Sequence, residues 1–136
     1  MSPLDEVVAS WLDKADGDMR MASLGLTVRP PVPWIVGFHA QQAAEKLLKG
    51  FLTFRSVEFE KTHNIGYLLQ LCEELEPRFA ALCPKALKLS YYAVQARYPL
   101  ISPEPSEAEA REAAAIAEQV RALVFSVLPP RFSVKP

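Results

Sequence analysis

The sequence predicts an all-α protein, a four- to five-helix up-and-down antiparallel bundle. Apolar residues recur at helical spacing in five segments, whereas no stretch of useful length alternates apolar and polar residues as a strand would. Short connections join the segments, and helices joined in this way pack antiparallel. A length of 136 residues suits a single core. We expect one domain at 1–128 and a flexible tail at 129–136.

The first two helices are predicted from residue 3 to near 25 and from about 33 to 55. Ser2 offers a capping hydroxyl, and a proline and an acid follow it, which is typical of a helix start. The connector RPPVP is stiff because each proline lacks an amide donor and restrains the residue before it. In the second helix Glu45 falls among apolar neighbours, so we expect it at the border of the core.

The third and fifth helices each carry a capping pattern at their start. Residues 62–64, Thr-His-Asn, offer capping groups before a helix that ends at Pro77. Ser106 and Glu109 form a capping box before a helix that runs to about Val127. The ends of these helices are therefore defined by local chemistry.

The fourth helix is predicted from about residue 84 to Tyr98, where Pro99 stops it. We expect a neighbouring helix to approach closely along a stripe of small residues, which would place Arg97 beside a carboxylate. Glu45 is the candidate partner, because a buried carboxylate without one is costly. A Glu45–Arg97 or glutamine-bridged network would fix the helix register, and a polar cleft holding a phosphate or base is the alternative. The large apolar stripe is Leu87, Tyr91, Val94 and Tyr98, and the small stripe is Ala86, Ser90, Ala93 and Arg97.

Composition and charge exclude several classes of protein. The formal net charge of -1 gives no global basic field, so contact with nucleic acid would need a local basic cluster. No apolar run approaches the roughly 18 residues that a membrane span requires. The N-terminal residues lack the layout of a signal peptide. We therefore expect a cytoplasmic protein that makes no contact with a membrane.

Three motifs, in this order and at these separations, resemble the HEPN domain family. They are QQAAEKLLKGFL at 41–52, KTHNIGYLL at 61–69 and ARYP at 96–99. The resemblance covers about residues 5–125 and implies a four- or five-helix bundle, commonly a homodimer. It also implies a partner, since prokaryotic members are often encoded beside a minimal nucleotidyltransferase, with which they form a toxin–antitoxin or nucleotide-handling pair.

One feature of the RNA-cleaving members of this family is missing. They carry an arginine, then four to six residues, then a histidine whose imidazole can transfer protons. Counting from Arg97, the corresponding positions hold Ser102, Pro103 and Glu104, and both histidines lie far upstream. We therefore expect a non-catalytic domain. A metal-independent endoribonuclease toxin and a purely structural adaptor are the alternatives.

The histidines do not predict a metal site. His39 and His63 lack the spacing of ligand pairs and have no Cys/His cluster around them, so we expect no metal and no cofactor. We expect His63 to cap the third helix or to bond across to the second.

Binding would instead depend on a local cluster of basic residues near the end of the second helix and the start of the third. The alternative interpretation is that this cluster is only a solvated face of the protein. The cluster is Lys46, Lys49, Arg55, Lys61 and His63, with Arg97 nearby. A nucleotide or RNA is the expected ligand. The candidate ligand-binding residues are Gln42, Glu45, Lys46, Lys49, His63, Arg97 and Tyr98.

Overall fold

The protein is built from helices, as the computed structural model shows for residues 1–98, 100 and 103–132. No strand occurs in this part of the chain, and the all-α prediction is confirmed. None of the helices described is both long and apolar enough to cross a membrane. In chain order the elements are α1 (Pro3–Thr27), α2 (Pro33–Phe54), α3 (Ile65–Leu75), the 3₁₀ turn η1 (Pro77–Ala81), α4 (Cys83–Ala86), η2 (Leu87–Leu89), α5 (Ser90–Arg97), α6 (Glu107–Val127) and η3 (Pro130–Phe132).

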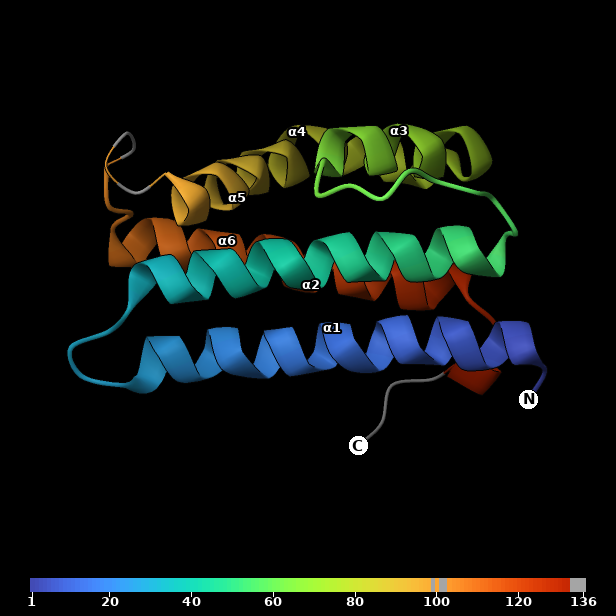
Figure 1. Ribbon diagram of the computed structural model, residues 1–136, viewed down its shortest axis with the longest axis horizontal. Helices are drawn as coiled ribbons and strands as arrows, with labels where there is room; N and C mark the ends of the chain where they lie inside the picture. Colours follow the sequence, from blue (N-terminus) through green and yellow to red (C-terminus); the bar gives the residue numbers. More distant parts are fainter. Residues whose placement is uncertain (99, 101–102, 133–136) are drawn as a thin grey trace.

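The helix α2 lies at the centre of the molecule. It runs antiparallel to α1 along its whole length, α6 packs behind it, and the chain from α3 to α5 covers the side away from α1 (Figure 1). Because α2 has neighbours on several sides, even its polar residues Gln41 and Glu45 are buried, as the sequence predicted for Glu45. Its fully buried apolar residues are Val36, Ala40, Ala43, Ala44, Leu47, Leu48 and Leu52.

The predicted caps hold the helix ends. The Ser2 hydroxyl oxygen accepts a hydrogen bond of 3.1 Å from the amide three residues later. Among residues 62–64, Asn64 is the residue that caps α3. Ser106 and Glu109 make both bonds of the capping box, at 3.0 and 2.9 Å. Each cap satisfies an amide that has no partner inside the helix.

The predicted fourth helix is not a single regular helix. It is divided into α4, η2 and α5, and its buried side chains recur at every third residue, as a 3₁₀ turn with three residues per turn would place them. The large apolar stripe predicted from 3.6-residue spacing is therefore turned outward, and Leu87, Val94 and Tyr98 are each about half exposed. The buried side chains are Ala86, Leu89, Tyr92 and Gln95.

Tyr92 holds α5 against two other helices. A Cβ atom at Gly37 of α2 would stand 2.1 Å from carbons of the Tyr92 ring, so only glycine allows this close approach. The Tyr92 hydroxyl donates a hydrogen bond of 3.2 Å to the carbonyl of Glu109 on α6. Burial raises the pKa of this hydroxyl to about 12, so it keeps its proton. The position of α5 is thus defined relative to both α2 and α6.

The packed part of the chain continues beyond α6. Phe132 in η3 is buried in the core, although the sequence placed residues 129–136 in a flexible tail. Arg131 donates two hydrogen bonds to the carboxylate of Asp5, at 3.0 and 3.2 Å, and lowers the pKa of that carboxyl. The remainder of the predicted tail, 133–136, lies outside the residues described.

Candidate functional site

Glu45 bonds to His63 and not to Arg97. The Glu45 side chain is 2% exposed, and one of its oxygens, Oε1, lies 2.7 Å from Nδ1 of His63, just before α3. The prediction that His63 bonds across to the second helix is confirmed, whereas the predicted Glu45–Arg97 pair is wrong. Arg97 lies on the exposed end of α5 and has no ion pair or hydrogen bond among the residues described.

The bond to Glu45 determines how the imidazole of His63 is presented. A carboxylate accepts hydrogen bonds, so the proton of this contact belongs to Nδ1 of the histidine. The other ring nitrogen, Nε2, is available to further partners. It accepts a hydrogen bond when the ring is neutral and donates one when the ring is charged. The His63 side chain is 51% exposed, so a partner can come from solvent.

Three further polar residues support this pair. Lys49 Nζ lies 3.7 Å from the same Glu45 oxygen and 5.4 Å from the centre of the Trp11 ring. Gln42 donates a hydrogen bond of 2.7 Å to the side chain of Gln41. Gln41 in turn donates one of 3.4 Å to the backbone carbonyl of His63. These residues of α2 therefore fix the chain just before α3.

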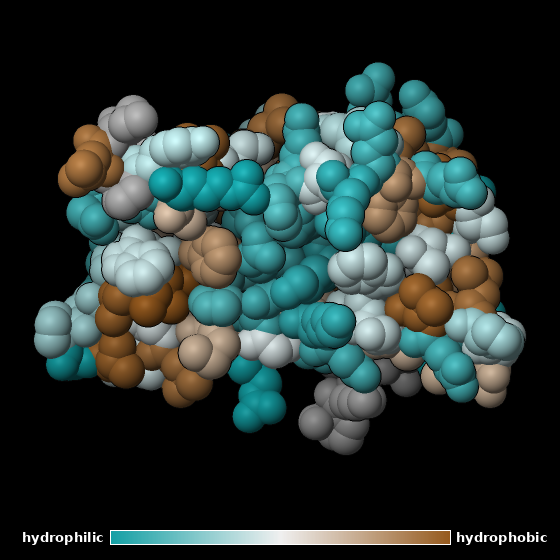
Figure 2. Space-filling view, viewed as in Figure 1, coloured by the Kyte–Doolittle hydropathy of each residue, from teal (hydrophilic) through white to brown (hydrophobic). Residues whose placement is uncertain are grey.

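An open groove of about 560 Å³ lies between the start of α3 and α5. Ser90 and Ala93 of the small stripe line this groove and are not covered by a neighbouring helix there, whereas Ala86 of the same stripe is buried. Hydrophilic side chains gather over the middle of the face that Figure 2 shows, with apolar side chains toward both ends. The residues that line the groove are Lys61, Thr62, His63, Asn64, Ser90, Ala93, Val94, Arg97 and Tyr98.

The lining of the groove is basic. Of the residues that the structure describes, Lys61, His63 and Arg97 line the groove and no acidic residue does. Asn64 caps the helix α3, so the positive end of the dipole of that eleven-residue helix also lies at the groove. The arrangement suits an anion and in particular a phosphate group, to which a guanidinium can donate two parallel hydrogen bonds.

The structure divides the predicted ligand-binding residues. His63, Arg97 and Tyr98 line the groove, Glu45 lies directly behind His63, and Gln42 lies one hydrogen bond further away. Lys49 is buried against Glu45.

Lys46 and Arg55 are also engaged elsewhere. Lys46 Nζ lies 2.5 Å from an oxygen of Asp18 on α1, and Arg55 lies over the ring of Phe51. The other oxygen of Asp18 lies 2.8 Å from Nδ1 of His39, a second histidine–carboxylate pair that the sequence analysis missed. His39 and Lys46 are seven residues apart, which puts both on one face of α2. This spacing was the feature of the sequence that could have indicated a shared partner.

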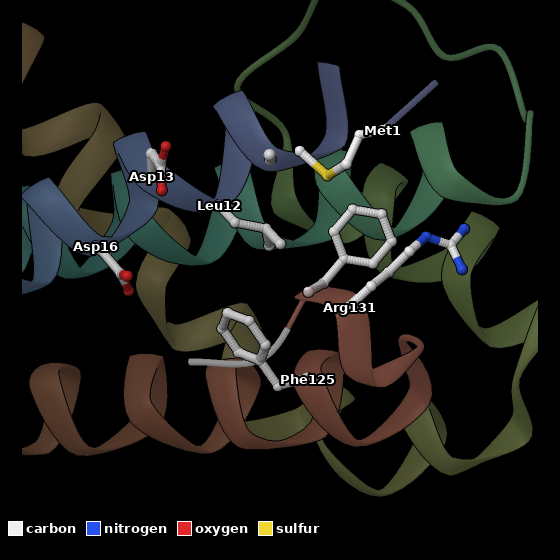
Figure 3. A pocket seen from close by; sticks show the side chains of 8 residues that line it. Met1, Leu12, Asp13, Asp16, Phe125 and Arg131 are labelled. Atoms are coloured by element: carbon white, nitrogen blue, oxygen red, sulfur yellow. The ribbon is translucent and has the colours of Figure 1, made fainter. Parts of the chain in front are cut away.

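A second cavity, of about 220 Å³, lies where α1 meets the end of α6 and the turn η3. Figure 3 shows the guanidinium of Arg131 at the opposite end of this cavity from the carboxylates of Asp13 and Asp16. The lining also includes Leu12, Phe125 and Phe132. Two acidic residues and mainly apolar walls make this cavity a poor site for a phosphate.

Comparisons with known proteins agree with this fold. The family model described as the HEPN domain matches residues 8–127. The crystal structure of an archaeal HEPN homologue is similar, with a TM-score of 0.70 and 24% identity over 98% of this chain and 100% of that one. No curated protein matches the chain significantly. Because the family model spans most of its length, the protein belongs to the HEPN domain family.

Proposed function

We propose that this protein is a non-catalytic HEPN domain that binds a nucleotide or RNA by its phosphate in the groove between α3 and α5. The observation that carries the proposal is Arg97, which lines a groove where the described residues include two other basic side chains and no acidic one. Among the residues described, no carboxylate neutralises its guanidinium. Such a side chain is well suited to bind a phosphate.

The rest of the groove supports a ligand larger than phosphate alone. Its volume of about 560 Å³ falls within the usual range of small-molecule sites. Tyr98 is exposed and offers a ring on which a base can stack. Thr62 and Ser90 add hydroxyl groups that can bond to a sugar or a base edge.

The test is the affinity of the purified protein for adenosine monophosphate and for a short single-stranded RNA, measured by calorimetry at low salt. We expect Arg97→Ala to weaken the affinity for whichever of the two probes binds by about tenfold, because it removes charge-assisted hydrogen bonds. The salt dependence of the affinity should also become less steep. Arg20→Ala is the matched control, since Arg20 is an exposed arginine on α1, outside the groove. Equal losses in the two variants would reject the groove as the site.

We further propose that the protein forms a homodimer. Leu87 faces outward between α4 and α5 and does not line the groove, so its apolar side chain is exposed and a second copy of the chain could cover it. Light scattering should report twice the mass of the chain, and Leu87→Glu should shift the mass toward one chain. A monomer in the unmodified protein would reject the dimer.

A minimal nucleotidyltransferase is the partner that we propose from the family resemblance, and the cytoplasm is the proposed location. A gene for such an enzyme beside the gene for this chain would support the pairing. Co-elution of the two purified proteins in gel filtration is the direct measurement. Separate elution at every ratio tested would reject a stable complex.

RNA cleavage is the second candidate function, because His63 and Arg97 line the same groove. His63, held through Nδ1, could supply the proton transfer for which the usual histidine after Arg97 is missing. We expect the protein to leave single-stranded RNA intact in a chelator-containing buffer. Cleavage that disappears in both Arg97→Ala and His63→Gln, with folding preserved, would establish the ribonuclease instead.

A further inference from the structure

We propose that phosphate binding in the groove is coupled to the uptake of one proton by His63, with Glu45 as the residue that positions its imidazole. This inference rests on the proposed function, because it concerns the same groove. Its geometric basis is the 2.7 Å contact between Nδ1 of His63 and Oε1 of Glu45. That contact occupies one ring nitrogen, and only Nε2 can donate to a ligand, which it does once the ring is protonated.

The charges around His63 determine the direction of the coupling. On α2, Glu45 places a negative charge beside the His63 ring, whereas Lys49 lies 3.7 Å from the same carboxylate oxygen and offsets part of that charge. Lys61 and Arg97 line the groove together with His63 and disfavour a further positive charge. Two acids of the segment before α3, Glu58 and Glu60, are not among the residues that line the groove.

The remaining neighbours of His63 in the described part of the chain do not add negative charge to the empty groove. Tyr98, which lines the wall formed by α5, offers a hydroxyl group and not a carboxylate. The helix α3 presents its positive end and has no acidic residue in its first turn. Around the ring of His63 in the empty groove, the buried carboxylate of Glu45 is therefore opposed by three basic side chains and the N-terminus of α3. The basic side chains are those of Lys49, Lys61 and Arg97. A bound phosphate adds negative charge and shifts the balance toward the protonated ring.

Two classes of ligand share this chemistry, and they can be distinguished. A phosphodiester, as in RNA, keeps one negative charge between about pH 5 and 8. A phosphomonoester, as in a nucleotide, gains a proton of its own near pH 6. For a diester, any proton taken up on binding belongs to the protein. A short single-stranded RNA is therefore the primary probe, and adenosine monophosphate is the second.

The experiment is titration calorimetry of the purified full chain at neutral pH. It is carried out in two buffers that differ in ionisation enthalpy. The difference in measured heat gives the number of protons taken up. We expect an uptake between zero and one for the RNA probe, and a Kd that rises about fivefold or more from pH 6 to pH 8, within the usual range of coupling between two bound ligands. Binding without proton uptake and with a Kd independent of pH would overturn the inference.

Two variants assign the proton. His63→Gln should abolish the uptake while Arg97 still supports weaker binding. His39→Gln is the matched control, since His39 also bonds a carboxylate through Nδ1, at 2.8 Å from Asp18, but does not line the groove. Uptake that survives in His63→Gln or disappears in His39→Gln would overturn the assignment. An absence of binding to either probe at any pH would instead reject the proposed function, so the two failures differ.

Discussion

Two clusters on the helix α2 have the same chemical composition and different surroundings. In one, Asp18 on α1 contacts His39 at 2.8 Å and Lys46 at 2.5 Å. In the other, Glu45 contacts His63 at 2.7 Å and Lys49 at 3.7 Å. Each cluster has a carboxylate, an imidazole bonded through Nδ1 and a lysine. The side chain of His39 is 24% exposed, whereas that of His63 is 51% exposed.

The difference shows that a histidine–carboxylate pair does not by itself identify a site. Between α1 and α2, the pair joins two long helices, and neither the groove nor the second cavity described above has Asp18, His39 or Lys46 in its lining. Before α3, the same pair lies at a groove that also contains Lys61 and Arg97. What distinguishes the two clusters is therefore the environment of the second ring nitrogen.

Removal of the two carboxylates is the strongest way to break the comparison. Glu45→Ala should lower the free energy of unfolding by about 3 kcal/mol, because Lys49 would remain buried without its counter-ion. Asp18→Ala should cost less, since Lys46 is 23% exposed and can reach water, whereas Lys49 is only 9% exposed. Urea denaturation of both variants is the measurement. Equal losses would show that the two clusters have the same energetic role.

A double-mutant cycle sharpens the comparison with a smaller effect. Glu45→Gln and His63→Gln should show a coupling of about 1 kcal/mol, because the two side chains share one hydrogen bond. Glu45→Gln and Arg97→Ala should be additive, since these residues do not interact. Unfolding free energies of the four proteins in each cycle provide the values. Coupling in the second cycle would restore the Glu45–Arg97 network predicted from the sequence.

The smallest effect is expected at the ion pair between Arg131 and Asp5, which contains no histidine and serves as a reference for both clusters. Arg131→Gln removes the partner of Asp5 and should lower the melting temperature by about 2 °C or less at neutral pH. Arg131 holds the pKa of Asp5 below its ordinary value, so this contribution is present above that ordinary value and is lost as pH falls through the lowered one. Melting curves of both proteins should therefore converge in acid, and a constant difference would contradict the assignment.

The sequence could predict features that depend on neighbouring residues. The caps at Ser2, Asn64 and Ser106 use groups within three residues of the amides that they satisfy, so their chemistry is visible in the chain. The burial of Glu45 followed from the spacing of apolar residues on one helix. The sequence did not predict that residues 83–97 are divided into two helices and a 3₁₀ turn. This division changes which side chains of the segment face the core, so the predicted apolar stripe faces outward.

The partners of charged residues were harder to predict, because they depend on how helices are rotated relative to one another. Asp18 lies 28 residues before Lys46, and nothing local shows that the two helices bring them together. The sequence predicts a Glu45–Arg97 pair because both residues lie near predicted packing faces. The 3₁₀ turn before α5 changes that rotation, so the arginine faces an open groove instead.

The division of the chain before α5 also has a consequence for amide hydrogen exchange. η1, α4 and η2 are short, and 3₁₀ turns have poorer hydrogen-bond geometry than α-helices, so residues 77–97 should open locally more often than the 22-residue helix α2. One wall of the groove, at His63, is tied to α2 by Glu45 and Gln41. The other wall, at Arg97, belongs to the segment that opens. A ligand that bridges the two walls should therefore slow deuterium uptake along the whole of that segment, including amides that it does not touch.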